Sequence, residues 1–201
     1  MQASVQNDLD TRGGGLRAAL VFGVLAVLLC GLAYPIAGTL IGGWAFPAQA
    51  GGSLVSVEGR QVGSTLVAQP FSAPGYFQPR PSAAGYNPMA AAGSNYAPSN
   101  PALRERMTAD AAAVAARDGI ALAAIPVELI SASGSGLDPH LSPAGARVQA
   151  ARIARARGID EAAVLALIDA HVEPAWLGVF GEPRVNVLLL NLALDQRASG
   201  P

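Results

Sequence analysis

The chain lacks lysine altogether, so all 13 of its basic residues are arginines, and its 14 acidic residues leave a net charge of −1. Without lysine there is no phosphate-binding loop of the Gly-x4-Gly-Lys type. Without an excess of positive charge there is no long-range field to attract nucleic acid. The single cysteine, Cys30, excludes an internal disulfide and any multi-cysteine metal site. Since the chain has only two histidines, His140 and His171, we predict no metal site.

Charged residues are also scarce, at 13% of the chain where about a quarter is usual. The shortage is concentrated near the N-terminus, because no charged residue lies between Arg17 and Glu58. Residues 18–41 are almost wholly aliphatic and, as a helix, would span about 36 Å, enough to cross a hydrocarbon core of about 30 Å. A secretory signal peptide is the alternative, with an Ala-x-Ala cleavage site at residues 48–50. Since the apolar run is far longer than a signal core of about 7–15 residues, we predict a retained single-pass anchor.

The arginines next to this anchor predict its orientation. Arg12 and Arg17 flank it closely on the N-terminal side, whereas the first arginine beyond it is Arg60. By the positive-inside rule, residues 1–17 stay in the cytoplasm and the remainder is exported across the inner membrane. Pro35 predicts a kink in the last third of the helix. Three aromatic residues are expected near the outer interface, namely Tyr34, Trp44 and Phe46.

After a juxtamembrane linker at residues 42–52, we expect one exported domain over residues 53–201. Residues 53–69 predict a hairpin, and helices are expected from Pro101 to about Gly119, from Pro143 to Gly158 and from Glu161 to about Val172. Residues 120–131 fit either a strand or a short helix. Residues 185–194 predict a buried strand, although a helix also fits their later half. The fold class is α+β, with several helices around a small sheet.

The proline-rich segment from residue 70 to residue 101 holds seven prolines and one charge, Arg80. Prolines at this density forbid a regular helix or a central strand, so we predict a long irregular loop. Its aromatic enrichment and charge depletion are typical of a protein interface, although the same aromatic residues would also pin the loop onto its own domain. We favour docking against another protein. The candidate docking residues are Phe71, Tyr76, Phe77, Arg80, Tyr86, Asn87 and Tyr96.

A cluster of Ser135, Asp138 and His140 suggests a hydrolase, but its spacing argues against one. A nucleophile, its base and the orienting carboxylate normally converge from distant parts of a chain. A Gly-x-Ser-x-Gly elbow would also need glycine where Ser133 stands. We therefore predict no catalytic residues and a turn stabilised by Asp138. An anchored or secreted periplasmic hydrolase or binding domain, unrelated to transport, is the alternative function.

Several short motifs follow the anchor in one order. They include Tyr-Phe-x-x-Arg-Pro-Ser (76–82), Tyr-Asn-Pro (86–88), Gly-Ser-Asn (93–95), Pro-Val-Glu-Leu (126–129), Ser-Gly-Ser-Gly-Leu-Asp-Pro-His (133–140) and Gly-Glu-Pro-Arg-Val-Asn-Val (181–187). Together they strongly resemble the C subunit family of the Kdp-type potassium-transporting ATPase, over nearly the whole chain. The glycines at 13–15 and the alanine-rich stretch at 89–92 depart from the family pattern.

The resemblance implies a non-catalytic inner-membrane subunit of a complex in which potassium is the transported ion. The implied partners are a channel-like potassium-binding subunit, a P-type ATP-hydrolysing subunit and a small membrane subunit. It also implies a role as catalytic chaperone that raises the ATP affinity of the pump subunit, with Gln149 at the position proposed to contact nucleotide. An exported domain cannot reach cytoplasmic ATP, so we favour a structural role and assign no cofactor to this subunit itself. Asp138, Glu182 and Asp195 are candidates for cation selection, but a solvated or hydrogen-bonded acid is the favoured state of each.

Overall fold

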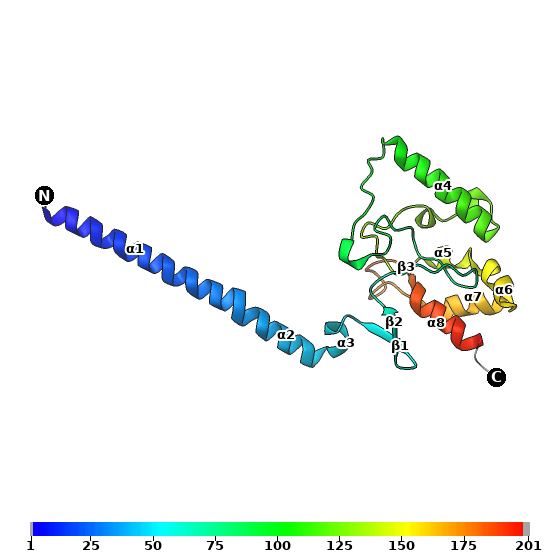
Figure 1. The fold of residues 1–201 in the computed structure, drawn as a ribbon, viewed down its shortest axis with the longest axis horizontal. Helices are drawn as coiled ribbons and strands as arrows, with labels where there is room; N and C mark the ends of the chain where they lie inside the picture. The colour runs from blue at the N-terminus through cyan, green and yellow to red at the C-terminus, as the bar shows by residue number, and fades with distance from the viewer. Residues whose placement is uncertain (1, 199–201) are drawn as a thin grey trace. The chain divides into compact units, whose positions relative to one another are not determined.

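The computed structural model describes residues 2–198 of the chain, and the side chains of residues 15–197. Contacts divide the chain into two units after Gly52. The first unit is helical, and the second combines helices with short strands (Figure 1).

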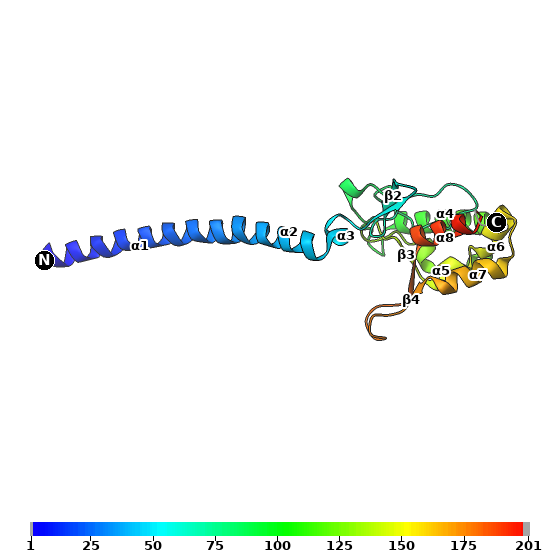
Figure 2. The ribbon, with the colours of Figure 1, turned by 90° about the horizontal axis from the view of Figure 1, so that it is seen from below.

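The first unit is one long helix followed by a short one. Helix α1 (Gln2–Leu28) passes through a π-helical turn at Leu29–Ala33 into α2 (Tyr34–Ala45), and α3 spans Pro47–Ala50 (Figure 2). The stretch Gly15–Ala45 is apolar and long enough to cross a membrane, and the side chains of its most apolar window are all exposed. At about 1.5 Å per residue it extends about 46 Å, beyond both ends of the predicted anchor. A helix that is apolar all round and exposed along its length is a membrane helix.

Pro35, where the sequence predicts a kink, follows a π-helical turn at Leu29–Ala33. Proline lacks the N–H for an i→i−4 bond and its ring crowds the preceding turn, so the backbone there must widen or bend. The helix continues without a break after Pro35, and the hydroxyl of Thr39 donates to the Pro35 carbonyl at 2.8 Å.

The second unit begins with the expected hairpin. Strand β1 (Leu54–Val57) pairs antiparallel with β2 (Arg60–Ser64). The two residues between them, Glu58 and Gly59, have φ angles of 50° and 78°. Positive φ at both central residues is the geometry of a type I′ turn, which Gly tolerates without steric cost.

Capping residues set the helix ends where the sequence predicted them. Helix α4 (Pro101–Asp118) starts with the Asn100 side chain accepting from Ala102 N at 3.0 Å, and it ends at Gly119 with φ 71°. Helix α7 (Glu161–Ala170) starts in the same way at Asp160. The helix predicted over 143–158 is instead two, α5 (Pro143–Arg147) and α6 (Ala150–Arg157), because a turn at residues 148–149 interrupts it.

Residues 185–194 form a strand only at their start, and the alternative of a helix in their later half is confirmed, with the helix beginning already at Val187. Only Arg184–Asn186 form a strand, β5, which pairs antiparallel with β3 (His140–Leu141) and β4 (Val172–Glu173). Helix α8 (Val187–Ala198) follows at once. Its buried side chains at 187, 188, 190, 191 and 194 recur at helical spacing, and this period outweighs the β-like composition. The fold is α+β, as predicted.

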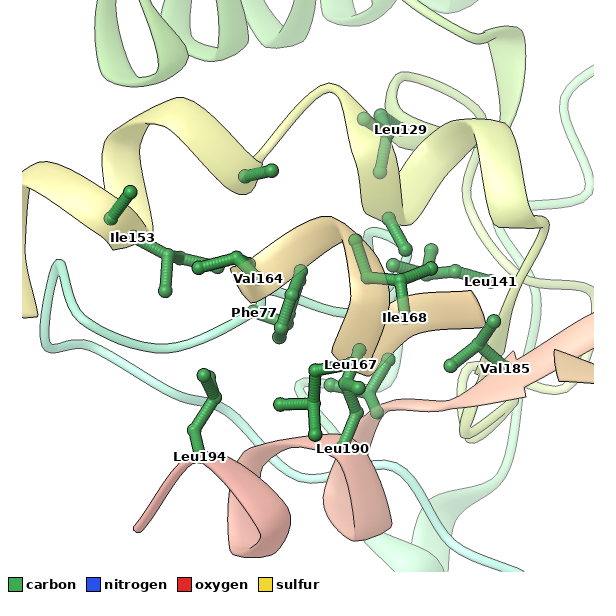
Figure 3. Close-up of a cluster of buried hydrophobic side chains, with 14 of the residues drawn as sticks. Phe77, Leu129, Leu141, Ile153, Val164, Leu167, Ile168, Val185, Leu190 and Leu194 are labelled. Atoms are coloured by element: carbon green, nitrogen blue, oxygen red, sulfur yellow. The ribbon is translucent and has the colours of Figure 1, made fainter. Parts of the chain in front are cut away.

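One core holds the second unit together. Phe77, from the proline-rich segment, lies among side chains of three helices, with Ile153 from α6, Val164 from α7 and Leu194 from α8 (Figure 3). All four are fully buried or nearly so. Burial of such side chains contributes about 1.5–3 kcal/mol each, so the segment is part of the folding unit.

Candidate functional site

The proline-rich segment 70–101 was the predicted docking site, and its first part is bound tightly to its own domain. Phe77 has 0% of its surface exposed. Its backbone N–H donates to Asn191 Oδ1 at 2.8 Å, and Asn191 Nδ2 donates to the Phe77 carbonyl at 3.0 Å. The side-chain amide of Asn191, on α8, thus makes the two hydrogen bonds that a neighbouring strand would otherwise make to the N–H and carbonyl of this buried residue.

Gln149 makes the equivalent contact one residue further on. Its Oε1 accepts from Gln78 N and from Arg152 Nη2, both at 2.8 Å, while its Nε2 donates to the carbonyls of Gln78 and Gly145, both at 3.1 Å. These four bonds use the full capacity of an amide side chain. Because Gln149 is also completely buried, it has no free donor or acceptor for a nucleotide.

Two arginines on α6 hold the carbonyls just before Phe77. Arg152 donates to the carbonyls of Pro74 and Tyr76 and to Asp118, whose carboxylate is buried with it 2.6 Å away. Burial lowers the pKa of Arg152, and the carboxylate of Asp118 opposes that shift. Since a buried charge is costly without a partner, this pair fixes α4, α6 and the loop relative to one another.

Arg157 repeats the arrangement nearer the surface. It donates to the Gly75 carbonyl at 2.6 Å and to Asp195 at 2.8 Å, and its guanidinium stacks 4.7 Å from the centre of the Tyr76 ring. The Tyr76 hydroxyl donates to the same carboxylate at 3.0 Å. Phe71 packs on Tyr76 with ring centres 5.6 Å apart.

The second part of the loop is held by the Ser-Gly-Ser-Gly-Leu-Asp-Pro-His segment. Arg80 forms an ion pair with Asp138 at 3.1 Å, and Ser82 Oγ donates to the Gly136 carbonyl at 2.6 Å. A Cβ on Gly136, where φ is 71°, would lie 2.6 Å from the Ala92 carbonyl. The two segments therefore approach each other closely enough to require glycine.

Asp138 has its charge stabilised within this contact. Burial alone would raise the pKa of Asp138, but hydrogen bonds from His140 and the positive charge of Arg80 outweigh it and hold the pKa below its ordinary value. Ser135 Oγ accepts from Leu137 N at 3.1 Å and lies 3.3 Å from Ser133 Oγ. These bonds build a turn, and among residues 15–197 none joins Ser135 to His140.

Comparison with known proteins agrees with this architecture. The family model described as "K+-transporting ATPase, c chain" matches residues 16–196. The chain belongs to this family. It is 58% identical over 188 residues to the potassium-transporting ATPase KdpC subunit of Xanthomonas axonopodis pv. citri, covering 93% of this chain and 91% of that one. It is 52% identical over 184 residues to the KdpC subunit of Shewanella putrefaciens, and 55% identical over 183 residues to that of Sorangium cellulosum. These alignments cover 92% and 90% of this chain and 90% and 96% of the two relatives respectively.

Membership of the K+-transporting ATPase c-chain family confirms the resemblance found in the sequence, and with it the prediction of a non-catalytic subunit. The docking role of the loop stays a prediction. Phe77 is unavailable to a partner because it lies in the core, and Phe71, Tyr76, Arg80 and Tyr86 are half-buried and bound within the domain. Burial raises the pKa of Tyr86, with Arg117 acting in the opposite direction. The exposed members of the set are Asn87 and Tyr96.

Two of the three acids that are candidates for cation selection are likewise bound within the domain. Asp138 and Asp195 are engaged with arginines, at 3.1 Å and 2.8 Å, whereas Glu182 makes no ion pair within residues 15–197. In that part of the chain no cluster of three or more histidine, cysteine, aspartate or glutamate side chains is arranged to hold a metal ion.

One exposed feature was missed by sequence reasoning, the loop that joins β4 to β5. It projects away from the helices (Figure 2) and carries Trp176, Leu177, Val179 and Phe180 at its tip. The available signal was an uncharged run with two aromatic residues between Glu173 and Glu182. The run is short and is flanked by Pro174 and Gly181, residues typical of turns.

Proposed function

We propose that this chain is a single-pass accessory subunit of an ATP-driven potassium uptake complex, with its domain 53–201 outside the inner membrane, where it stabilises the assembly. The observation that carries the proposal is an exposed membrane helix joined by a short linker to a self-contained domain, in a chain of the K+-transporting ATPase c-chain family. The name shared by its relatives supplies the transported ion.

Three partners follow from this proposal, namely a channel-like potassium-binding subunit, a P-type subunit that hydrolyses ATP and a small membrane subunit. The helix supplies one contact, because an apolar helix in lipid packs against neighbouring helices through its small residues. Gly23, Gly31 and Gly38 recur along Gly15–Ala45, and a Cβ at Gly23 or Gly38 would meet no atom within 4 Å. These positions leave room for close approach of a partner helix.

The contacts of Gln149 favour a structural role over direct nucleotide binding. All four hydrogen-bonding positions of its side chain are occupied by the protein itself, and access to them requires the segment around Gln78 to leave the core. Leaving these buried groups unpaired costs about 1–3 kcal/mol each. A chaperone effect on the pump's ATP affinity would then act through the assembly and not through this side chain.

Potassium uptake tests the proposal directly. Deleting this chain while the other subunits are retained should abolish growth and uptake at low external potassium, and the full-length chain should restore both. A Ser135→Ala variant should restore them equally well, because Ser135 only stabilises a turn. Unchanged uptake after the deletion would contradict the proposal. Loss of function in the Ser135 variant, with the protein still folded, would favour the hydrolase alternative.

A further inference from the structure

Residues 174–182, which make up all but the last residue of the loop between β4 and β5, are called the tongue. Its four apolar tip residues are 61% to 76% exposed and lie within five consecutive residues, whereas Leu66, Met89 and Leu122 are exposed at separate places along the domain. Contiguous exposed apolar groups of this kind usually mark an interaction site in a folded domain.

The tongue is ordered by its own hydrogen bonds. Trp176 N donates to the Phe180 carbonyl at 2.8 Å, and Phe180 N donates to the Trp176 carbonyl at 2.9 Å. The two rings lie against each other with centres 5.6 Å apart. At the base, Glu173 pairs with Arg184 across the β4–β5 ladder at 3.0 Å. The tip therefore presents a preformed aromatic knob, which loses little conformational entropy on docking.

The tip of the tongue is a tight turn, closed by a hydrogen bond from Val179 N to the Trp176 carbonyl at 3.2 Å. Leu177 has φ 53°, a left-handed conformation disfavoured for residues with a side chain, and it is 73% exposed. Gly178 follows with φ 73°, so the two residues have the positive φ pair that Glu58 and Gly59 have in the first hairpin. This turn directs the side chain of Leu177 into solvent.

The charges around the tongue decide between a lipid surface and a protein partner. Two glutamates and one arginine lie in residues 172–184, giving −1, and the arginine is paired with Glu173. Within this segment, the charge nearest the tip along the chain and outside that pair is therefore Glu182. Anionic lipid surfaces attract Lys and Arg and repel carboxylates, whereas an aromatic knob with an acidic edge complements an apolar pocket with a basic rim.

We propose that the tongue docks, through Trp176 and Phe180, into an apolar pocket with a basic rim on the extramembrane face of another subunit of the complex. This inference rests on the proposed function, and it adds a contact between the exported domain and another subunit. Residues 46–52 alone join the membrane span to the domain, so the tongue is held at a high effective concentration beside neighbouring membrane proteins.

Photocrosslinking in intact membranes tests the contact. A photoreactive amino acid replaces Val179 in the full chain, expressed together with the other subunits, and a matched probe replaces Leu122, which is exposed on the same domain. We expect crosslinks from position 179 to one named subunit and at least tenfold less from position 122. Crosslinks to lipid alone, or none at all, would overturn the inference.

Two variants separate docking from folding. Trp176→Ala with Phe180→Ala should reduce co-purification with the complex by tenfold or more, while the pair Leu122→Ala and Val127→Ala should change it less than twofold. The unfolding midpoint of each should stay near that of the wild type, since all four side chains are exposed. Equal co-purification of both pairs would overturn the inference.

Reversing the charge of Glu182 distinguishes a protein partner from a lipid surface, because the two predict opposite changes. Glu182→Arg should weaken co-purification if the rim of the pocket is basic, and it would strengthen membrane association if the tip enters anionic lipid. A stronger association of this variant with the membrane would overturn the proposal of a protein partner. If the wild-type chain itself fails to co-purify with the other subunits, the proposed function is wrong. If the wild type and all the tongue variants co-purify equally well, the proposed function stands and only the docking of the tongue is wrong.

Discussion

At the scale of single residues, buried amides decide how the proline-rich loop is held. Asn191 and Gln149 each bond both the N–H and the carbonyl of a loop residue, at 2.8–3.1 Å. A loop without secondary structure has no ladder to satisfy its backbone, so side chains must do so. This gives the family's candidate nucleotide-contacting glutamine a structural explanation.

Replacing Gln149 by Ala should therefore act on stability. The change removes the partner of the part-buried N–H and carbonyl of Gln78, and we expect the free energy of unfolding to fall by about 2–4 kcal/mol. Denaturant unfolding of the full chain in detergent measures it. Gln61→Ala on the exposed side of β2 is the control and should change less than about 0.5 kcal/mol. A stable Gln149 variant with weakened ATP affinity of the complex would instead support direct nucleotide contact.

The acid response of the domain should depend on Asp138. Because its folded-state pKa lies below the unfolded value of about 3.9, its stabilising effect is fully present above that pH. The effect is lost as the pH falls through the lower folded-state pKa. Asp138→Asn should thus be less stable than the wild type at pH 7 and lose less stability on acidification. Parallel stability curves for the two proteins between pH 7 and pH 3 would contradict this.

At the scale of elements, caps were predictable and long-range contacts were not. Asn100, Asp160 and Gly119 mark helix ends by local chemistry that any reader of the sequence can use. Residues 185–194 left strand and helix open because their apolar composition suits both structures, and the burial of Leu190 and Leu194 on one face selects the helix. The burial of Phe77 depends on partners more than a hundred residues away, which composition cannot reveal.

The contact between loop and turn makes a prediction for two neighbouring glycines. Gly136→Ala should lower the free energy of unfolding by about 2 kcal/mol or more, because φ is 71° and the new Cβ would press on the Ala92 carbonyl. Gly134→Ala is the matched control, since a Cβ there meets nothing within 4 Å. Thermal unfolding of both variants measures the difference. Equal stability would show that the segments do not need their close approach.

At the scale of the whole molecule, the scarcity of charge has two separate explanations. One is the membrane helix Gly15–Ala45, which was predictable from hydropathy alone. The other is the loop 70–101, whose aromatic residues were predicted to face a partner and mostly stabilise their own domain. Its exposed residues Asn87 and Tyr96 stay candidates for docking, and the tongue adds a second candidate surface. The tongue escaped prediction because exposure is a property of the folded chain.

The side of the membrane on which the domain lies is the central claim, and cysteine labelling tests it most directly. In a Cys30→Ala background, Ser99→Cys places one thiol in the exposed part of the loop, and Ser4→Cys places one before the membrane helix. A reagent that crosses the outer membrane but not the inner one should label position 99 in intact cells and position 4 only after the inner membrane is opened. The reverse pattern would contradict the account and place the domain beside cytoplasmic ATP.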